Sequence, residues 1–511
     1  MNCNIFFSPS GVALSVPSNA TIMDAERIAE LGFEYPCGGN GTCNKCMVEV
    51  TINGITKKVK SCTTRVEDGM IIKLCDNDDC DNKVMTSGKC DSLHVSPIID
   101  TSICSQPLGV AFDIGTTTIA AYLMSLKTGE LIDTLGELNQ QVKFGGDVIS
   151  RCIFSLKNGV ETISSCVNSQ ADEMINKLLV KNSLSKDDVL LISVVGNTCM
   201  HHIFAGINPT TLVEIPYMPK VFDAFEMPAK DFFKNVNKDA KTIFIPVIAG
   251  FVGADTVAAM QATGFDKKEK TTLLLDIGTN GEMVLGNKDR RVACSTASGP
   301  AFEGAKIVCG MRGSTGAIDH VDFKDGNLLI STIDNAKAKG ICGSGLIDII
   351  SVLLNEGVIM RSGRFDRKYD GPLKERITEI DGAKCIKLTD DVFITQKDIR
   401  EVQLAKGAIA AGIEIMAENL KITYDEINEV LIAGAFGNYM KPESMCCIKL
   451  LPPELLSKIV PVGNAAGEGS KMCLLSKEEY ENASIIAKKT EFIELASHDR
   501  FQELFIAQLD F

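Results

Sequence analysis

The sequence lacks the features of membrane, secreted and nucleic-acid-binding proteins. No apolar run reaches the roughly 18 residues that a transmembrane helix requires. The N-terminal residues contain neither a basic stretch nor an apolar one, so no secretory signal is visible and we expect a cytoplasmic protein. Acidic residues outnumber basic ones by 66 to 52, which gives a net charge of −14. Nucleic acids and anionic membranes bind basic surfaces, so neither is expected as a partner.

A P-loop nucleotide site is also absent, because the pattern G-x-x-x-x-G-K followed by Ser or Thr does not occur. The 511 residues, of which 45% are apolar and 23% charged, are enough for three or four globular domains. Nineteen cysteines are many for a chain too long to be a small disulfide scaffold. Most of them stand alone, as buried apolar residues do, but a cluster near the N-terminus indicates a metal site.

Residues 1–75 are predicted to form a small β-rich domain. Two apolar stretches within 4–16 flank a Ser-Pro-Ser-Gly turn and predict a hairpin. Helix-forming residues fill 22–31, and alternating residues on both sides of an Asn-Gly turn predict a second hairpin over 45–60. A hairpin, a helix and a second hairpin suit a β-grasp domain.

Four cysteines in this domain have a spacing that indicates an iron–sulfur site. Cys37, Cys43 and Cys46 form C-x5-C-x2-C in a glycine-rich stretch, and Cys62 follows after fifteen further residues. A [2Fe–2S] cluster needs four thiolates, two for each iron. Glycines let a loop turn sharply and point its N–H groups at sulfur. We therefore predict that these four cysteines hold a [2Fe–2S] cluster.

A zinc site and a set of free thiols are the alternatives. Zinc sites usually contain two C-x2-C pairs, and only one is present here. The stretch resembles the cluster loop of β-grasp ferredoxins, but its fourth cysteine comes earlier than theirs. Cys75 is therefore the reserve candidate for the fourth ligand, and Cys80 is a weaker one.

The rest of the chain divides into a linker and two larger units. Residues 76–107, rich in Asp, Asn, Ser and Gly, are predicted to be a solvated linker. From residue 108 onward apolar strands alternate with amphipathic helices, as in α/β domains. We predict a first subdomain over 108–270 and a second over 271–511, each with one of two related segments.

These related segments predict a pair of phosphate-binding hairpins. Asp113 and Asp276 each begin the sequence Asp-Ile-Gly-Thr between two apolar runs. One such turn alone is often an ordinary strand connection. Two turns that face each other would bind a triphosphate between them through N–H groups and hydroxyls. Each Asp would hold Mg²⁺ through water. The expected contacts are Gly115, Thr116, Thr117 and Thr118 in the first turn, and Gly278, Thr279, Asn280 and Gly281 in the second.

A third element follows a predicted buried strand over 430–433. Its turn contains Gly434, Ala435, Phe436 and Gly437. Small side chains at such a turn let a flat purine lie against the backbone, although the same pattern also suits a plain strand-to-helix turn. With the two hairpins it predicts a complete nucleotide site.

Four further residues have both a structural and a functional interpretation. His201 and His202 suit a helix with one buried and one exposed ring, or an axial ligand or phosphate contact. Asp255 and Glu303 occur in glycine-containing turns, where they are solvated acids or groups that orient water or Mg²⁺.

In chain order, Asp113, Asp276 and Gly434 resemble the phosphate-1, phosphate-2 and adenosine motifs of the actin, sugar-kinase and Hsp70 ATPase superfamily. A ferredoxin-like domain joined to two such actin-like (ribonuclease H-like) subdomains resembles, over nearly the whole chain, the reductive activators of corrinoid proteins. The segments that also fit this family are 145–151, 196–202, 298–304 and 340–346.

The resemblance implies ATP with Mg²⁺ and the transfer of one electron from the cluster to a corrinoid protein of a methyltransferase system, whose Co(II) returns to Co(I). It also implies an upstream electron donor, and it leaves a homodimer open. Some such activators have further cysteine runs for [4Fe–4S] clusters near the C-terminus. Here no cysteine follows Cys473, so we expect one cluster.

Other functions suit parts of the pattern. A small-molecule kinase of the same fold would leave the clustered cysteines unexplained. An ATP-driven chaperone would use the cluster as a sensor or a structural support. An activator of another metalloenzyme, such as a radical dehydratase, would place one cluster between two subunits and would lack a separate ferredoxin domain.

Overall fold

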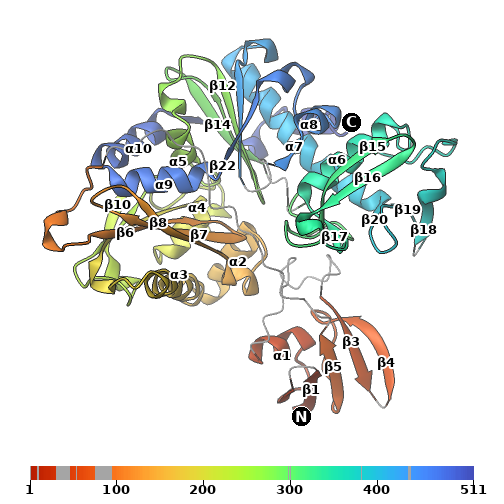
Figure 1. The fold of residues 1–511 in the computed structure, drawn as a ribbon, viewed down its shortest axis with the longest axis horizontal. Helices are drawn as coiled ribbons and strands as arrows, with labels where there is room; N and C mark the ends of the chain where they lie inside the picture. The colour runs from red at the N-terminus through yellow and green to blue at the C-terminus, as the bar shows by residue number, and fades with distance from the viewer. Residues whose placement is uncertain are drawn as a thin grey trace.

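The computed structural model describes residues 2–8, 11–29, 46–52, 54–74, 95–296, 299, 301–380, 382–434 and 439–511. The chain forms a small N-terminal β domain and a larger body of two lobes (Figure 1). Within the described ranges, no helix is both long enough and apolar enough to span a lipid bilayer.

The N-terminal domain is a five-stranded sheet with one helix, and its strand order is β2-β1-β5-β3-β4. Both predicted hairpins are confirmed, since β1 pairs with β2 and β3 with β4, each antiparallel. The helix predicted over 22–31 is confirmed for its first seven residues. The elements are β1 (Asn2–Ser8), β2 (Val12–Pro17), α1 (Ile22–Ile28), β3 (Met47–Ile52), β4 (Ile55–Lys60) and β5 (Met70–Leu74).

Strand β5 joins the two hairpins, and the sequence does not predict it. It pairs parallel with β1 and antiparallel with β3, so it completes the sheet between them. Its five residues are too few to show a clear period. Alternate residues of these strands, among them Ile5, Phe7, Val48 and Ile72, are buried and form the core of the domain.

The first lobe is built on a six-stranded sheet with the order β10-β11-β9-β6-β7-β8. Its central strand β6 is parallel to β9 and antiparallel to β7. Helices α2 to α4 cover one face, and helix α9 packs on the other. The elements are β6 (Leu108–Ile114), β7 (Thr118–Ser125), β8 (Leu131–Leu138), α2 (Val148–Asn158), α3 (Glu161–Lys181), β9 (Val189–Gly196), α4 (Thr198–Phe204), β10 (Phe225–Pro228), β11 (Lys241–Phe244) and α5 (Ala254–Ala262).

The second lobe repeats this plan on a sheet with the order β22-β21-β12-β13-β14-β23. Here β12 is parallel to β21 and antiparallel to β13. The large sheet is formed by β12 (Thr272–Ile277), β13 (Gly281–Gly286), β14 (Arg291–Thr296), β21 (Glu429–Ala433), β22 (Ile459–Gly463) and β23 (Glu491–Phe492). The helices are α6 (Gly343–Asn355), α7 (Gln396–Leu420), α8 (Pro442–Cys447), α9 (Ala465–Leu475), α10 (Lys477–Lys489) and α11 (Phe501–Ala507).

Two three-stranded sheets extend the second lobe on the side that carries α6 (Figure 1). The first consists of β15 (Ala317–Lys324), β16 (Asn327–Thr332) and β17 (Gly340–Ile341). The second consists of β18 (Ile377–Ile380), β19 (Ala383–Lys387) and β20 (Phe393–Thr395).

Helices α5 and α9 lie between the two large sheets and hold the lobes together. They approach so closely that a Cβ atom on Gly469 would lie 2.1 Å from the carbonyl oxygen of Ala258, so only glycine fits there. The Ser470 hydroxyl donates to the carbonyl oxygen of Phe112 on β6 at 3.1 Å. Helix α9 is therefore in direct hydrogen-bonded contact with the strand that carries the first predicted hairpin.

The segment 95–107, part of the predicted linker, lies against this helical layer. The amide of Ser96 donates to the carbonyl oxygen of Leu475, and the amide of Lys477 donates to that of Ser96, both at 2.8 Å. Ile98, Ile99 and Cys104 pack on the apolar cluster beneath. The chain is thus fixed to the body at the junction of α9 and α10.

Candidate functional site

A cavity of about 540 Å³ lies between the two lobes. Both predicted strand–turn–strand hairpins are confirmed, as β6–β7 and β12–β13, and both turns line the cavity. Gly281 instead packs toward Thr296 and Ile409, and residues 435–437 lie outside the described chain. The predicted residues that line the cavity are Asp113, Gly115, Thr116, Thr117, Thr118, Asp276, Gly278, Thr279, Asn280 and Gly434.

Each turn is closed by a backbone hydrogen bond from its glycine, and the second turn is one residue shorter than the first. In the first, the amide of Gly115 donates to the carbonyl oxygen of Thr118 at 2.9 Å, and in the second the amide of Gly278 donates to that of Asn280 at 2.9 Å. A Cβ atom on Gly115 would lie 2.8 Å from the Thr118 carbonyl oxygen, so the first turn requires glycine. Each turn is therefore tight, with its hydroxyl side chains next to the cavity.

Among the half-buried carboxylates that line this cavity, four have a pKa that burial raises. The pKa of Asp113 rises to about 6, although a hydrogen bond from Asn464 opposes the rise. Burial and the charge of Asp113 raise the pKa of Asp276 to about 7. Burial and the charges of Asp276 and Asp113 raise the pKa of Asp255 to about 7. The pKa of Glu282 is well above its usual value because of burial and the charges of Asp255 and Asp276.

Such a group of acids is stabilised by a cation. No three His, Cys, Asp or Glu side chains in the described part of the chain are arranged to hold a metal ion by themselves. Mg²⁺ keeps several waters and is commonly bound by one or two carboxylates together with substrate phosphates. The carboxylates around this cavity fit that mode of binding.

Glu303 links the two hairpins directly. Its Oε2 accepts a hydrogen bond from the Thr117 hydroxyl at 2.9 Å, and its Oε1 accepts one from the Thr279 hydroxyl at 2.6 Å. The two hydroxyl oxygens are 3.4 Å apart. With 8% of its surface exposed, Glu303 is buried, so its interpretation as a solvated acid is wrong. It lies where one ligand can contact both lobes.

Two asparagines that the sequence does not single out as site residues support the first hairpin. Asn464 donates from Nδ2 to Asp113 Oδ2 at 2.9 Å, and Asn197 donates from Nδ2 to the Thr116 hydroxyl at 2.9 Å. Each also caps the helix that follows it. The signal in the sequence is an Asn between a buried strand and a helix, a pattern that many N-caps share.

Arg151 supports the same hairpin from behind. It is 1% exposed, and its Nη2 donates to the carbonyl oxygen of Thr116 at 2.6 Å. Its Nε donates to the carbonyl oxygen of Gly145 at 2.9 Å. Burial lowers the pKa of Arg151 to about 10, so the guanidinium stays charged at neutral pH. The segment 145–151 thus positions the first turn.

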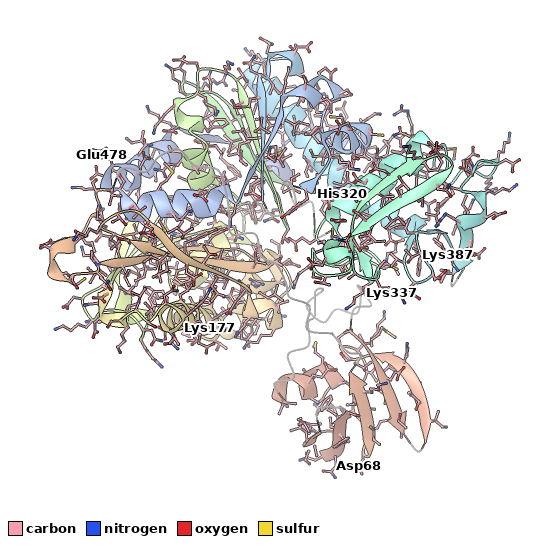
Figure 2. The ribbon with its side chains drawn as sticks, in the orientation of Figure 1. Asp68, Lys177, His320, Lys337, Lys387 and Glu478 are labelled. Atoms are coloured by element: carbon pink, nitrogen blue, oxygen red, sulfur yellow. The ribbon has the colours of Figure 1, made fainter. Side chains whose placement is uncertain are left out.

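Much of the remaining lining comes from the second lobe and includes Arg312, Asp319, Ser344 and Tyr439. Asp319 lies on β15 and accepts a hydrogen bond from the Ser331 hydroxyl at 2.6 Å. The next residue, His320, is labelled in Figure 2. These residues lie apart from the two hairpin turns along the chain and line the same cavity.

Both histidines of the His201–His202 pair are buried, at 1% and 0% exposure, so the interpretation with one exposed ring is wrong. Neither lines the cavity. Burial lowers their pKa values to about 3 and about 4, so both rings are neutral. His201 packs edge-on against Phe225 and Phe244, which indicates a structural role.

In the N-terminal domain, Cys46 and Cys62 lie together with their Sγ atoms 3.2 Å apart. The β3–β4 hairpin brings them together, since one precedes β3 and the other follows β4. They are 1% and 5% exposed. Cys37, Cys43 and Cys75 lie outside the described residues. Two adjacent buried thiols fit half of the ligand set of a [2Fe–2S] cluster.

Comparison with protein-family models agrees with this architecture. A 2Fe–2S iron–sulfur cluster binding domain matches residues 5–67. The RACo middle region matches residues 108–268, and the C-terminal ASKHA domain of RACo matches residues 270–511.

Individual proteins align over most of the chain. The corrinoid activation enzyme RamQ of Eubacterium limosum is 32% identical, and the alignment covers 96% of each chain. The Co(II) methylated amine-specific corrinoid protein reductase of Methanosarcina barkeri is 26% identical over 79% of this chain and 77% of its own. The solved structure of a reductive activator for a corrinoid, iron–sulfur protein has a TM-score of 0.73 at 28% identity, covering 99% of this chain and 98% of its own.

A ferredoxin-type 2Fe–2S domain joined to an ASKHA, or actin-like ATPase, fold defines the class of this protein. The architecture expected from the sequence is confirmed. The chain belongs to the RACo family of reductive activators of corrinoid proteins.

Proposed function

We propose that the chain binds ATP with Mg²⁺ in the cavity between the lobes and uses it to drive the one-electron reduction of a corrinoid protein from Co(II) to Co(I). The proposal rests on the observation that both hairpin turns and Gly434 line one cavity. In the N-terminal domain of the same chain, the thiols of Cys46 and Cys62 lie next to each other. The corrinoid protein is one of a methyltransferase system, and an upstream donor reduces the N-terminal domain.

The triphosphate is placed between the two turns. Thr117 and Thr279 supply hydroxyl donors from opposite lobes, and Asp113 and Asp276 orient Mg²⁺, in part through water. A ligand shifts a conformational equilibrium only by its differential affinity for the two states. A triphosphate that contacts both turns at once binds more tightly when the lobes are close together. Nucleotide binding therefore shifts the conformational equilibrium of the protein toward that arrangement.

The four predicted ligands of the iron–sulfur site are Cys37, Cys43, Cys46 and Cys62. When bound, a [2Fe–2S] cluster supplies the single electron that the cobalt needs. The 3.2 Å separation of the Cys46 and Cys62 sulfurs favours Cys62 over Cys75 as the fourth ligand. Burial of both thiols keeps water away from that side of the site.

The test uses the full chain prepared anaerobically. Cys62→Ser should remove the visible absorption of the cluster and the appearance of Co(I) in a Co(II) corrinoid protein, while nucleotide binding stays unchanged. Cys75→Ser should keep both, and Cys447→Ser, far along the chain, is the matched control. Loss of the cluster in Cys75→Ser but not in Cys62→Ser would overturn the ligand assignment. Co(I) formation by the wild type that does not depend on ATP would overturn the proposed coupling.

A further inference from the structure

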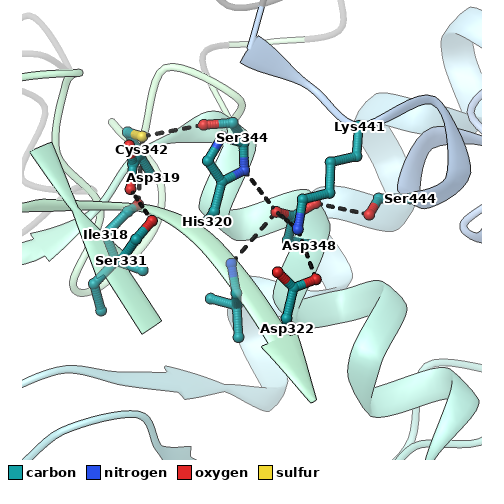
Figure 3. Close-up of polar contacts among 11 residues, drawn as sticks. Ile318, Asp319, His320, Asp322, Ser331, Cys342, Ser344, Asp348, Lys441 and Ser444 are labelled. Carbon is teal, nitrogen blue, oxygen red and sulfur yellow. Dashed lines mark hydrogen bonds and ion pairs between the residues drawn. The ribbon is translucent and has the colours of Figure 1, made fainter. Parts of the chain in front are cut away.

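Asp348 on α6 is the centre of a polar cluster that joins three elements of the second lobe (Figure 3). The side chain of Asp348 is 1% exposed. Its Oδ2 is 2.9 Å from His320 Nδ1 on β15 and 3.4 Å from Nζ of Lys441, the residue that caps α8. Its Oδ1 accepts a hydrogen bond from the Ser444 hydroxyl on α8 at 2.7 Å. We call His320, Asp348, Lys441 and Ser444 the Asp348 cluster.

Strand β15 and helix α6 each carry a residue that lines the cavity, and a third lining residue lies in the segment just before α8. Asp319 precedes His320 on β15, Ser344 lies one helical turn before Asp348 on α6, and Tyr439 lies two residues before Lys441. The Asp348 cluster itself is outside the cavity lining. It therefore fixes the relative positions of three cavity walls without touching a ligand.

A buried carboxylate holds its neighbours in place because losing one of its partners leaves a desolvated charge. Lys441 is held from a second side, by Asp322 Oδ1 at 2.7 Å. Burial lowers the pKa of Lys441, but the hydrogen bond with Asp322 and the charge of Asp348 outweigh this effect and raise it. The ammonium is thus a lasting counter-charge for Asp348.

His320 is the member of the cluster that changes charge near neutral pH. The charged groups that face it are Asp348 on α6, Asp319 on its own strand and Lys441 before α8. The hydrogen bond with Asp348 raises the pKa of His320, against burial and the charge of Lys441. Protonated His320 makes a charge-assisted bond to Asp348, and this contribution is lost as the pH rises through the pKa of His320.

We propose that Asp348 is a positioning residue for the nucleotide: it holds the walls that carry Asp319, Ser344 and Tyr439 in one arrangement, with His320 as its pH-sensitive partner. The inference rests on the nucleotide site proposed above. The affinity for nucleotide then depends on residues that the ligand does not contact, and it contains a component that weakens as the pH rises.

The experiment measures the affinity of the full chain for ADP without Mg²⁺, by calorimetry, at several pH values between about 6 and 8.5. Asp348→Asn should weaken binding about tenfold, and Ser444→Ala should weaken it less. His320→Gln should bind ADP several-fold more weakly than the wild type at the lowest pH and equally well at the highest. The ratio of the variant's dissociation constant to that of the wild type should therefore fall toward one as the pH rises. His498→Gln, which changes a histidine outside the cavity lining, is the control for this pH profile and should match the wild type throughout.

The outcomes separate this inference from the site on which it rests. A wild-type chain that does not bind ADP would overturn the nucleotide site itself, and the inference with it. Wild-type binding together with a ratio for His320→Gln that is constant across the pH range would overturn the inference alone. If Asp348→Asn does not fold, His320→Gln and Ser444→Ala, which remove one partner each, still decide the question.

Discussion

Gly434 lies directly against the carboxylate of Asp276. A Cβ atom on Gly434 would be 2.6 Å from Asp276 Oδ1 and 2.9 Å from the carbonyl oxygen of Ile277. Gly434 also has a φ of +90°, in the region that favours glycine. It follows the last residue of β21, Ala433, which pairs with Asp276 on β12. The second hairpin and the turn after β21 therefore form one continuous wall of the cavity.

We expect Gly434→Ala to weaken nucleotide binding at least about tenfold, which is about 1.4 kcal/mol. The added methyl group would displace Asp276 or the turn that follows β12. Gly357→Ala is the matched control, since Gly357 has a φ of +72° but no atom within 4 Å of the added methyl group. Both variants should lose similar stability from backbone strain, and only the first should lose affinity. Equal affinities would show that the contact with Asp276 is irrelevant to binding.

The raised pKa values of the acidic residues predict how the site responds to pH. Mg²⁺ binds ionised carboxylates, and the pKa values of Asp113, Asp255 and Asp276 are about 6, 7 and 7. The affinity for Mg²⁺ with nucleotide should therefore rise as the pH goes from about 5.5 to 8. In Asp276→Asn the affinity should be lower and its dependence on pH weaker. Calorimetric titration at constant ionic strength measures both, and an affinity that falls with pH would contradict this assignment.

Stability without nucleotide should change in the opposite direction. The carboxyl group of Asp276 has a higher pKa in the folded protein than its ordinary value of 3.8. Its contribution to stability is complete when the pH is below 3.8 and is lost as the pH rises through the folded pKa. The melting temperature should thus fall between about pH 4 and 7 and level off above. At pH 8 Asp276→Asn should melt higher than the wild type, with a free energy of unfolding larger by about 1 kcal/mol or more. A lower melting temperature at pH 8 would mean that Asp276 stabilises the fold.

The sequence predicts the parts of this protein that depend on local pattern. Two repeats of Asp-Ile-Gly-Thr between apolar runs are enough to predict the hairpins, because strand and turn formation depend on near neighbours. Glu303 could not be assigned in this way, since its partners Thr117 and Thr279 are 186 and 24 residues away in the chain. Asn464 is 351 residues from Asp113. Contacts of this kind depend on how the lobes pack, and a single sequence does not contain that information.

Glu303→Gln should separate nucleotide binding from hydrolysis. In the proposed complex the phosphate oxygens take the hydroxyls of Thr117 and Thr279, and we expect the Glu303 carboxylate then to orient and deprotonate an attacking water. The variant should bind nucleotide within about threefold of the wild type and hydrolyse it about a hundredfold more slowly. Glu478→Gln, on the exposed face of α10 (Figure 2), is the control. Hydrolysis at the wild-type rate would leave Glu303 with a purely structural role.

Arg151→Met should damage the first hairpin from outside the cavity. Removing the guanidinium leaves the carbonyl oxygens of Thr116 and Gly145 without their donor, at a cost of about 2–4 kcal/mol of unfolding free energy. Nucleotide affinity should fall as well, because Thr116 moves with its carbonyl group. Lys157→Met, at an exposed position of the same helix, should change neither quantity. Chemical denaturation and calorimetry on the two variants provide the comparison.

The pairing of Ser96 with Leu475 has a consequence for the supply of electrons. Strand β5 ends at Leu74, so 21 residues (75–95) lie between the N-terminal domain and this anchor, and a chain of that length spans no more than about 75 Å. A domain held within that radius is present at an effective concentration of about millimolar, however dilute the protein is. Under the function proposed above, we therefore expect the reduction of a partner bound to the body to be a first-order step, so that only the binding of the partner slows on dilution.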